Sequence, residues 1–509
     1  MWVSLPKRIP LKYTFLFALL LCSAELVEGT TGYIVGCVFA CLFLATFAFN
    51  KAGGFSYPTG AYVFFVSTLT LFVGLLVKAV LGEPVQANLR DARASITIYL
   101  IGMAAMYLAV VFSRRFVRKE PFLEKIAPKG DQQRIALTAV VFGVVVPSIA
   151  SLLGPRASSI FVQLNYFAAF GLLLAVYYRC KATNGRSSFT IPIFVVAIFI
   201  EIGGILSFSK QLMYTPVAAW VIAAAAAGCW VTRKQILVMT GLALFMLGVL
   251  APYSQYGRSH AAEYGEGVNG AIYLLAHPDI SARGGREIVI PGEHPQVNLE
   301  AATDDYHWFN RPMGIWDRLN MFAIDDGLFY LTNNGHVFGW EPLVAYFENT
   351  VPHVLWKDKP AVNFGNVYAH EMGILAEDDD TTGISFSPFG DAYHMGRWWG
   401  VGLVLPLILF MSFVVVDSVV GRTERAPWAL IFFLWYAHTG PEGLLGAPVY
   451  YATTGLFSLL LAVMAMVYVM PVLSAILLGP ESRSPEAVEL GPAIQPGPGS
   501  VANEFSAGN

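Results

Sequence analysis

The chain has 509 residues, of which 56% are hydrophobic and only 13% are charged, and its mean hydropathy is +0.56. This composition excludes an ordinary soluble domain and is typical of a protein that crosses a membrane many times. The formal net charge of −3, together with the lack of any long basic run in the sequence, argues against a nucleic-acid-binding protein.

The sequence begins with a basic flank and an apolar run, MWVSLPKRIPLKYTFLFALLLCSAELVEG. A second apolar run follows at once, so we expect an uncleaved first helix rather than a signal peptide. A helix of roughly 20 apolar residues spans a bilayer and satisfies its own backbone there. We therefore predict an all-α polytopic membrane protein with about twelve transmembrane helices, centred near Leu19, Cys41, Leu71, Ala104, Val144, Phe170, Val196, Ala223, Phe245, Leu409, Phe433 and Val463.

Lysine and arginine are unevenly distributed among the connections between these helices. With the N-terminus inside the cell, nineteen of the thirty-two basic residues fall in cytoplasmic connections and five fall in short outer loops. The other eight belong to one long segment, and long segments are translocated across the membrane regardless of their Lys and Arg content. The positive-inside rule therefore predicts that both termini are cytoplasmic and that the long segment lies outside.

This long segment divides the chain into four predicted parts. We expect about nine membrane helices in 1–251, a large and mostly helical extracytoplasmic loop in 252–398, and the last three membrane helices in 399–479. Residues 480–509 are rich in Pro, Gly, Ser and Glu, which predicts a disordered cytoplasmic tail.

The loop is too long for a connector and is not of low complexity, which indicates a functional insert. Residues 312–331 and 339–356 have the mixed apolar and charged spacing of amphipathic helices. Residues 282–300 alternate and contain β-branched side chains, which predicts one short strand or hairpin.

Chemistry-bearing side chains gather in residues 351–400, just before the apolar run VGLVLPLILFMSFVVV. His370–Glu371 begins like the HExxH zinc motif, but Ile374 stands where the second histidine would be. The acidic run 377–380 lacks the spaced ligands of a calcium loop. We therefore predict no metal site.

Cations and tryptophans remain as the main features of the outer segment. Tryptophans at a membrane surface are commonly anchors, but their rings are also flat platforms on which sugars stack. An arginine side chain binds phosphate through two parallel N–H donors. Together these residues indicate a lipid-linked phosphosugar as the ligand.

Three stretches resemble motifs of bacterial Wzy-type oligosaccharide repeat-unit polymerases. PHVLWKDKPAVNFGN (352–366) is similar to their P-R-x-x-W-x-x-K-P element, although His353 replaces the arginine. SFSPFGDAYHMGRWWGVGLVL (385–405) is similar to their S-x-x-P-x-G-E-x-Y-x-N-x-G-x-x-G element, with Asp391 in place of glutamate. ILSFSKQLMYTPVAAW (205–220) resembles a weaker element with a basic position, held here by Lys210.

This resemblance implies a GT-C-like glycosyltransferase that needs neither metal nor cofactor. It would polymerise undecaprenyl-diphosphate-linked repeat units into an exopolysaccharide or O-antigen at the outer face of a bacterial inner membrane, with the large loop in the periplasm. Donor and acceptor would both be lipid-linked oligosaccharides, and chain-length regulators and export proteins would be its partners.

Displacing a sugar from diphosphate leaves negative charge on the leaving group, which fixed cations must stabilise when no metal does so. The attacking hydroxyl also needs a base. We predict Asp391 as that base, with His394 and His370 as alternatives, and Arg397 as a further catalytic residue. The predicted substrate-binding residues are Lys210, Arg311, Arg318, Trp356, Lys357, Lys359 and Tyr393.

Three alternatives stay open. An O-antigen-ligase-like transferase would carry a His-Asn type element where this chain has GDAYHMG. A flippase or exporter would bury ionisable residues in several spans, whereas the sequence places mainly Glu201 at mid-span. A non-catalytic subunit of a polysaccharide export complex would need no base and no diphosphate site.

Overall fold

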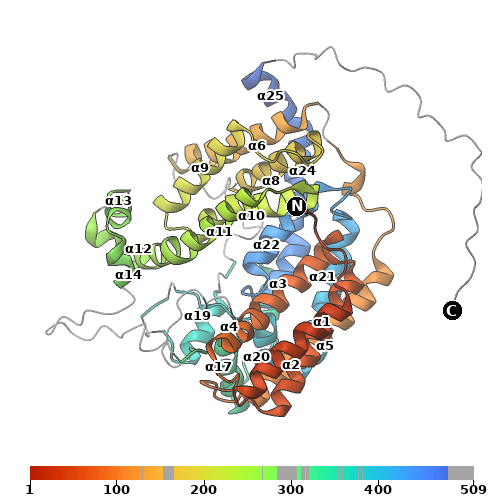
Figure 1. Ribbon diagram of the computed structural model, residues 1–509, viewed down its shortest axis with the longest axis vertical. Helices are drawn as coiled ribbons and strands as arrows, with labels where there is room; N and C mark the ends of the chain where they lie inside the picture. The colour runs from red at the N-terminus through yellow and green to blue at the C-terminus, as the bar shows by residue number, and fades with distance from the viewer. Residues whose placement is uncertain are drawn as a thin grey trace, which may run out of the picture.

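The computed structural model describes residues 1–127, 130–152, 165–265, 268–283, 307–310, 316, 320–351, 356, 359–360, 362–375, 378–380 and 382–479 (Figure 1). These residues are largely helical, and the two strands among them, β1 (Trp2–Val3) and β2 (Cys229–Trp230), form one antiparallel pair. The predicted tail in 480–509 and most of the predicted strand in 282–300 lie outside the described residues.

The first half of the chain is a series of apolar helices joined by short connections. In chain order they are α1 (Leu11–Val27), α2 (Gly32–Ala52), η1 (Gly54–Ser56), α3 (Pro58–Ser67), η2 (Thr68–Phe72), α4 (Val73–Leu81), α5 (Ala92–Phe116), η3 (Leu123–Lys125), α6 (Gln132–Leu152), α8 (Asn165–Ala182), α9 (Ile191–Leu206), α10 (Lys210–Ala227), α11 (Arg233–Phe245), η5 (Met246–Leu250) and α12 (Ala251–Tyr264).

The second half holds shorter helices before the chain returns to long apolar ones. They are α13 (Val268–Ala276), α14 (Pro278–Arg283), α17 (Phe322–Asn333), α18 (Glu341–Glu348), α19 (Phe364–Glu371), α20 (Pro388–Trp399), η6 (Gly400–Val404), α21 (Leu405–Val420), η7 (Pro427–Leu430), α22 (Ile431–Thr439), α23 (Gly446–Tyr450), η8 (Tyr451–Gly455), α24 (Leu456–Met464), η9 (Ala465–Val469) and α25 (Met470–Leu478).

Six continuous helical segments of the described residues are long and apolar enough to cross a membrane. They are Gly32–Ser56, Pro58–Leu81, Ala92–Phe116, Arg233–Ser254, Pro388–Val420 and Gly446–Leu478. A helix lies at each of the twelve predicted centres, but several of these helices are shorter than a full span. The prediction of a helical membrane protein is confirmed, and the number of twelve crossings stays a prediction.

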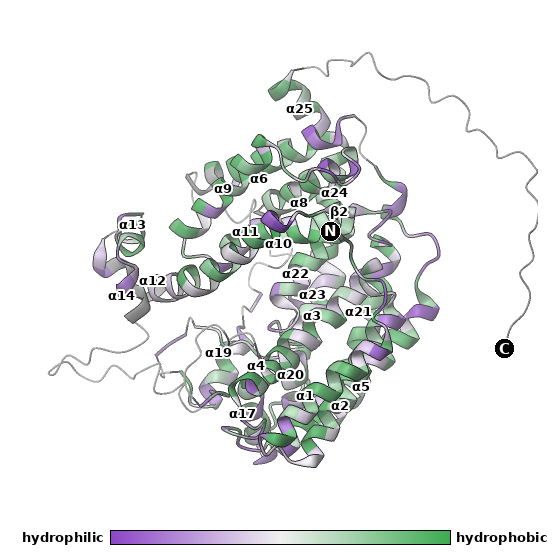
Figure 2. Ribbon diagram, in the orientation of Figure 1, coloured by the Kyte–Doolittle hydropathy of each residue, from purple (hydrophilic) through white to green (hydrophobic). Residues whose placement is uncertain are grey.

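The helices form two groups, which Figure 1 shows at different inclinations. In the first group, α2 packs between α1 and α5, and α21 packs on α5. In the second group, α8 packs against α6 and α10, and α9 packs on α10. Helix α22 contacts both α3 and α10, so it joins the two groups. The helix bodies are mainly hydrophobic in Figure 2, and hydrophilic residues gather in the connections.

One end of the bundle, here called the basic end, collects the N-terminus and every second connection. The β1–β2 pair ties the N-terminus to the α10–α11 connection, and Trp230 donates to the Gly185 carbonyl after α8 (2.7 Å). Further contacts join the remaining connections at this end: Lys7–Glu424 (2.5 Å), Thr423 N–Ser56 O (3.0 Å), Arg425–Glu124 (3.4 Å) and Arg134–Leu478 O (2.6 Å).

The opposite end, here called the loop end, collects the connections after α1, α4 and α22 together with residues 307–310, 320–351, 362–375, 378–380 and 382–387. Val85 donates to the Thr30 hydroxyl (2.9 Å), and the Asn310 backbone donates to Glu83 (3.1 Å). Phe386 pairs with Gly443 before α23. The part of the large loop that the structure describes near α17 to α20 therefore packs directly on the ends of the membrane helices.

The two predicted boundaries of the large loop differ in their local structure. At residue 251 the helix runs without a break from α11 through η5 into α12. At residue 398 the helical segment is interrupted just before the boundary, because Gly396 and Arg397 have non-helical φ and ψ. Helices α17 and α18 overlap the two predicted amphipathic stretches.

Candidate functional site

Helix α20 carries four of the predicted site residues and begins at a well-formed cap. The Ser387 side chain accepts hydrogen bonds from the backbone of Phe389 (3.1 Å) and Gly390 (3.0 Å), and Pro388 occupies the first turn. A serine cap followed by proline satisfies the free N–H groups and fixes the first helical φ. The sequence SPFG therefore starts α20 three residues before Asp391.

The α20 helix is broken near its end. Gly396 has φ −153° and ψ 25°, and Arg397 has φ +49° and ψ −131°. A residue other than glycine with positive φ is strained, and such strain is often retained at functional sites. A Cβ atom on Gly396 would lie 2.2 Å from the Trp340 ring, so only glycine fits beneath that ring. The break turns the Arg397 side chain outward, where it is exposed.

Five side chains and the Thr332 carbonyl meet at or beside this break, and we call these residues the break site: Trp340, Thr332, Glu371, His394 and Arg397. The Arg397 guanidinium donates to the Thr332 carbonyl (3.0 Å), and the Thr332 hydroxyl lies 2.8 Å from Nδ1 of His394. Nε2 of His394 lies 3.0 Å from Glu371. Thr332 thus brings the guanidinium and the Glu371–His394 pair together from α17, α19 and α20.

The hydrogen-bond partners of His394 define where its protons lie. A carboxylate only accepts, so Nε2 donates to Glu371. The Thr332 hydroxyl has one hydrogen, which goes either to the Leu328 carbonyl (2.7 Å) or to Nδ1. Nδ1 therefore accepts this hydrogen whenever the hydroxyl turns away from Leu328. His394 is fully buried, whereas the Glu371 side chain is 37% exposed and reaches the surface.

Asp391 has a different environment from the one that the sequence predicts. It is fully buried, and both of its oxygens accept hydrogen bonds: from Tyr368 (2.8 Å), Tyr346 (2.8 Å) and the Leu445 backbone (2.7 Å). Burial, together with the nearby Asp391 charge, raises the pKa of both tyrosines, so they remain donors. The geometry gives Asp391 the role of joining α18, α19 and residue 445, and it does not favour the predicted role of base.

Two further buried carboxylates, Asp325 and Asp326, were missed by the sequence reasoning. Asp325 accepts from the Tyr99 hydroxyl (2.6 Å) and from both the hydroxyl and the backbone of Ser387. Burial raises the pKa of Asp325 to about 7. The sequence places both in a predicted amphipathic stretch, and the packing of α17 on α5 and α20 buries them.

The remaining predicted residues do not gather at the break site as a group. Tyr393 lies beside it and donates to Asn333 (2.7 Å). Lys359 donates to the carbonyls of Val351 (2.9 Å) and Asn349 (3.3 Å) and so closes the turn after α18. The other placements are as follows: Trp356 is exposed, His370 contacts the Asp379 carbonyl (3.0 Å), Lys210 begins α10 in the second helix group, and Arg311, Arg318 and Lys357 lie outside the described residues.

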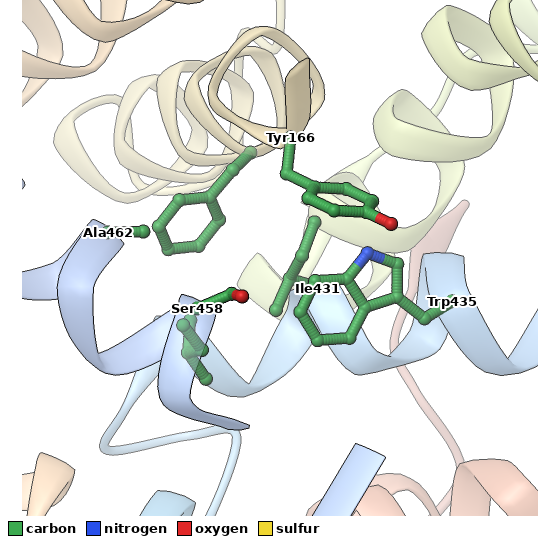
Figure 3. Close-up of a pocket in the computed structure, with 7 residues that line it drawn as sticks. Tyr166, Ile431, Trp435, Ser458 and Ala462 are labelled. Carbon is green, nitrogen blue, oxygen red and sulfur yellow. The ribbon is translucent and has the colours of Figure 1, made fainter. Parts of the chain in front are cut away.

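Two pockets among the described residues lie away from α20. The pocket in Figure 3 lies between α8, α22 and α24, has a volume of about 10 Å³, and is lined by residues that include Tyr166, Trp435 and Ser458. The other, of about 130 Å³, is lined by apolar residues and Tyr253 beside η5 and α13. Within the described residues, no group of three or more His, Cys, Asp or Glu is arranged to hold a metal ion. The break site is thus a surface site.

Comparison of the chain with protein-family models, with curated proteins and with solved structures finds no match.

Proposed function

We propose that this protein is a glycosyltransferase that polymerises lipid-diphosphate-linked oligosaccharide repeat units at the outer face of a bacterial inner membrane. The observation that carries the proposal is the break site, where an outward-facing guanidinium and a carboxylate–imidazole pair contact the same threonine. The resemblance of residues 385–405 to the Wzy-type polymerase motif also supports it, although His394 stands at an unspecified position of that motif and Arg397 stands where the motif has glycine.

The proposed topology has twelve crossings, a cytoplasmic basic end and a periplasmic loop end. The predicted inner connections contact one another at the basic end, and the described outer connections contact one another at the loop end. This grouping supports the alternation of inner and outer connections. The excess of Lys and Arg at the basic end supports its cytoplasmic placement.

In the proposed reaction, a hydroxyl of one lipid-linked glycan attacks the anomeric carbon of another. A bond forms between that oxygen and the anomeric carbon, and the bond from the carbon to the diphosphate oxygen breaks. The leaving electron pair stays on the diphosphate, and the Arg397 guanidinium stabilises its charge. The hydroxyl proton passes to Glu371, the one carboxylate of the break site that reaches the surface, so we assign the role of base to Glu371.

The role of His394 in this scheme is to hold Glu371 in place. The Nε2–H bond orients the carboxylate, and the Thr332 hydroxyl holds the other ring nitrogen. A buried imidazole hydrogen-bonded on both sides is a rigid support for a partly exposed base.

The test is polymerisation by the purified protein in phospholipid vesicles that contain polyprenyl-diphosphate-linked repeat units. We expect products that grow by one repeat unit, with release of polyprenyl diphosphate. Glu371→Gln should lower turnover about 10²–10⁴-fold, and Arg397→Ala should also reduce it strongly. Glu341→Gln and Arg93→Ala change exposed residues at the same end and should retain activity.

A deletion strain separates this proposal from its alternatives. Loss of polymer with single repeat units accumulating on lipid at the outer face supports a polymerase. Accumulation at the inner face would instead indicate a flippase, and normal polymer that is no longer attached to its final acceptor would indicate a ligase. Full activity of Glu371→Gln in vesicles would remove the proposed base.

A further inference from the structure

The backbone on both sides of Trp340 makes hydrogen bonds that hold this residue against the α20 break. Two residues earlier, the Phe338 backbone donates to the His394 carbonyl (3.0 Å), which ties the chain to α20. Trp340 itself precedes α18, and its carbonyl accepts from Val344 (3.3 Å) in the first turn. The backbone of Trp340 is therefore fixed relative to the break, and its position does not depend on the ring alone.

The ring of Trp340 lies directly on Gly396. A Cβ atom placed there would lie 2.2 Å from Cη2 and 2.6 Å from Cζ2 of the indole, so the six-membered ring covers the glycine. The residue is nevertheless 44% exposed. One part of the indole thus packs on the break while the rest remains open to a ligand.

The other described tryptophans do not combine these two properties. Trp308, Trp428 and Trp435 are buried, and Trp2 and Trp230 pack on each other at the basic end. Trp398 packs edge-on against Tyr393, and the 74% exposed Trp399 leads into the apolar segment of η6 and α21. Only Trp340, among the tryptophans that the structure describes, is both open and in contact with the residue that precedes Arg397.

We infer that Trp340 is the stacking platform for the sugar that is joined directly to the diphosphate of the donor. This inference rests on the proposed function and names the substrate class more closely, as a hexosyl diphosphate with an apolar C–H face. The phosphate-binding guanidinium and the first sugar must be neighbours because they hold adjacent groups of one substrate. The negative face of the indole attracts the weakly positive C–H groups of a sugar ring.

Binding to two probes tests the inference: a water-soluble polyprenyl diphosphate and its hexosyl ester. The unaltered protein should prefer the hexosyl probe by about two- to tenfold, as expected for one aromatic stacking contact. Trp340→Leu keeps an apolar side chain over Gly396 but removes the aromatic face, so it should lose this preference and still bind the sugar-free probe. Trp340→Phe should retain most of the preference, and the control Trp399→Leu should retain all of it.

The outcomes separate the inference from the proposed function. If Trp340→Leu keeps the full preference for the hexosyl probe, or weakens both probes equally, Trp340 is only a packing residue and the inference is wrong. Arg397→Ala should weaken both probes. If the unaltered protein binds neither probe, or if Arg397→Ala changes neither affinity, the proposed diphosphate site fails and the inference fails with it.

Discussion

The Asp326 carboxylate lies against the first turn of α5 and accepts a hydrogen bond from the Ser95 hydroxyl at 2.6 Å. The same carboxylate accepts from the backbone N–H groups of Arg90 (2.5 Å) and Asp91 (3.2 Å). A side chain of α17 thus caps the start of α5, which lies more than 200 positions earlier in the chain. Helices α17 and α5 are therefore joined directly at this point.

Removal of that carboxylate should destabilise the whole protein. Asp326→Ala leaves three donors without their acceptor, and each buried donor left unsatisfied costs about 1–3 kcal/mol. We expect a clear fall in the apparent melting temperature in detergent, measured by tryptophan fluorescence. Asp380→Ala changes an exposed aspartate of the same loop and should leave it unchanged. An equal, small effect of both substitutions would show that the cap is not needed.

Asp391→Asn distinguishes a positioning residue from a base. The amide group of asparagine would face one of the three donors that the carboxylate now accepts from, so stability should fall by about 1–3 kcal/mol. Transfer should fall through loss of folded protein and of the α20 geometry, and the remaining activity should keep the wild-type pH profile. An Asp391→Asn protein with unchanged melting temperature, intact donor binding and no turnover would instead restore Asp391 as the base.

Three substitutions of Arg397 separate strain from chemistry. Arg397→Gly and Arg397→Ala both lose the guanidinium, but only glycine adopts a φ of +49° without strain. Arg397→Gly should therefore be more stable than Arg397→Ala by about 1 kcal/mol or more. This difference should be measured as a higher melting temperature of the glycine variant. Both should lose transfer. Arg397→Lys should not rescue it, because lysine supplies charge without the two-pronged donor geometry. Full activity in Arg397→Lys would reduce this residue to a membrane-surface anchor.

Asp325 should make stability depend on pH. Its pKa rises from 3.8 in the unfolded chain to about 7 in the folded protein, so the folded state binds more protons between these values. The contribution of Asp325 to the free energy of unfolding is therefore fully present below about pH 4 and is lost as the pH rises through about 7. The full change is on the order of 4 kcal/mol. The melting temperature at pH 5.5 should exceed that at pH 8, and Asp325→Asn should flatten this difference. If the Asp325→Asn protein shows the same difference in melting temperature as the wild type, other groups cause the pH dependence.

Reporter fusions test the orientation of the two ends. A reporter that is active only outside the cytoplasm should be active after Asp305 and silent after Lys125. The expectation rests on the excess of Lys and Arg at the basic end. The reverse result would place the break site in the cytoplasm and exclude the proposed reaction.

The sequence alone determined the class of the protein and the location of its helices. All twelve apolar centres, from Leu19 to Val463, fall in helices, because an apolar segment in lipid must satisfy its backbone within itself. The sequence also named His394 and Arg397 as candidate site residues, and both belong to the break site.

Only the tertiary structure decided which of these side chains meet and what each contacts. Glu371 and His394 are 23 positions apart and meet because α19 packs beside α20, which no periodicity in the sequence indicates. Asp391 was predicted as the base, but Tyr346, Tyr368 and Leu445 converge on it from three separate segments and bury it. The Trp340 ring covers Gly396 directly beside the strained backbone of Arg397, a contact between segments more than 50 positions apart. Burial and backbone strain are properties of packed neighbours, so these roles depend on contacts that form only when the distant segments come together.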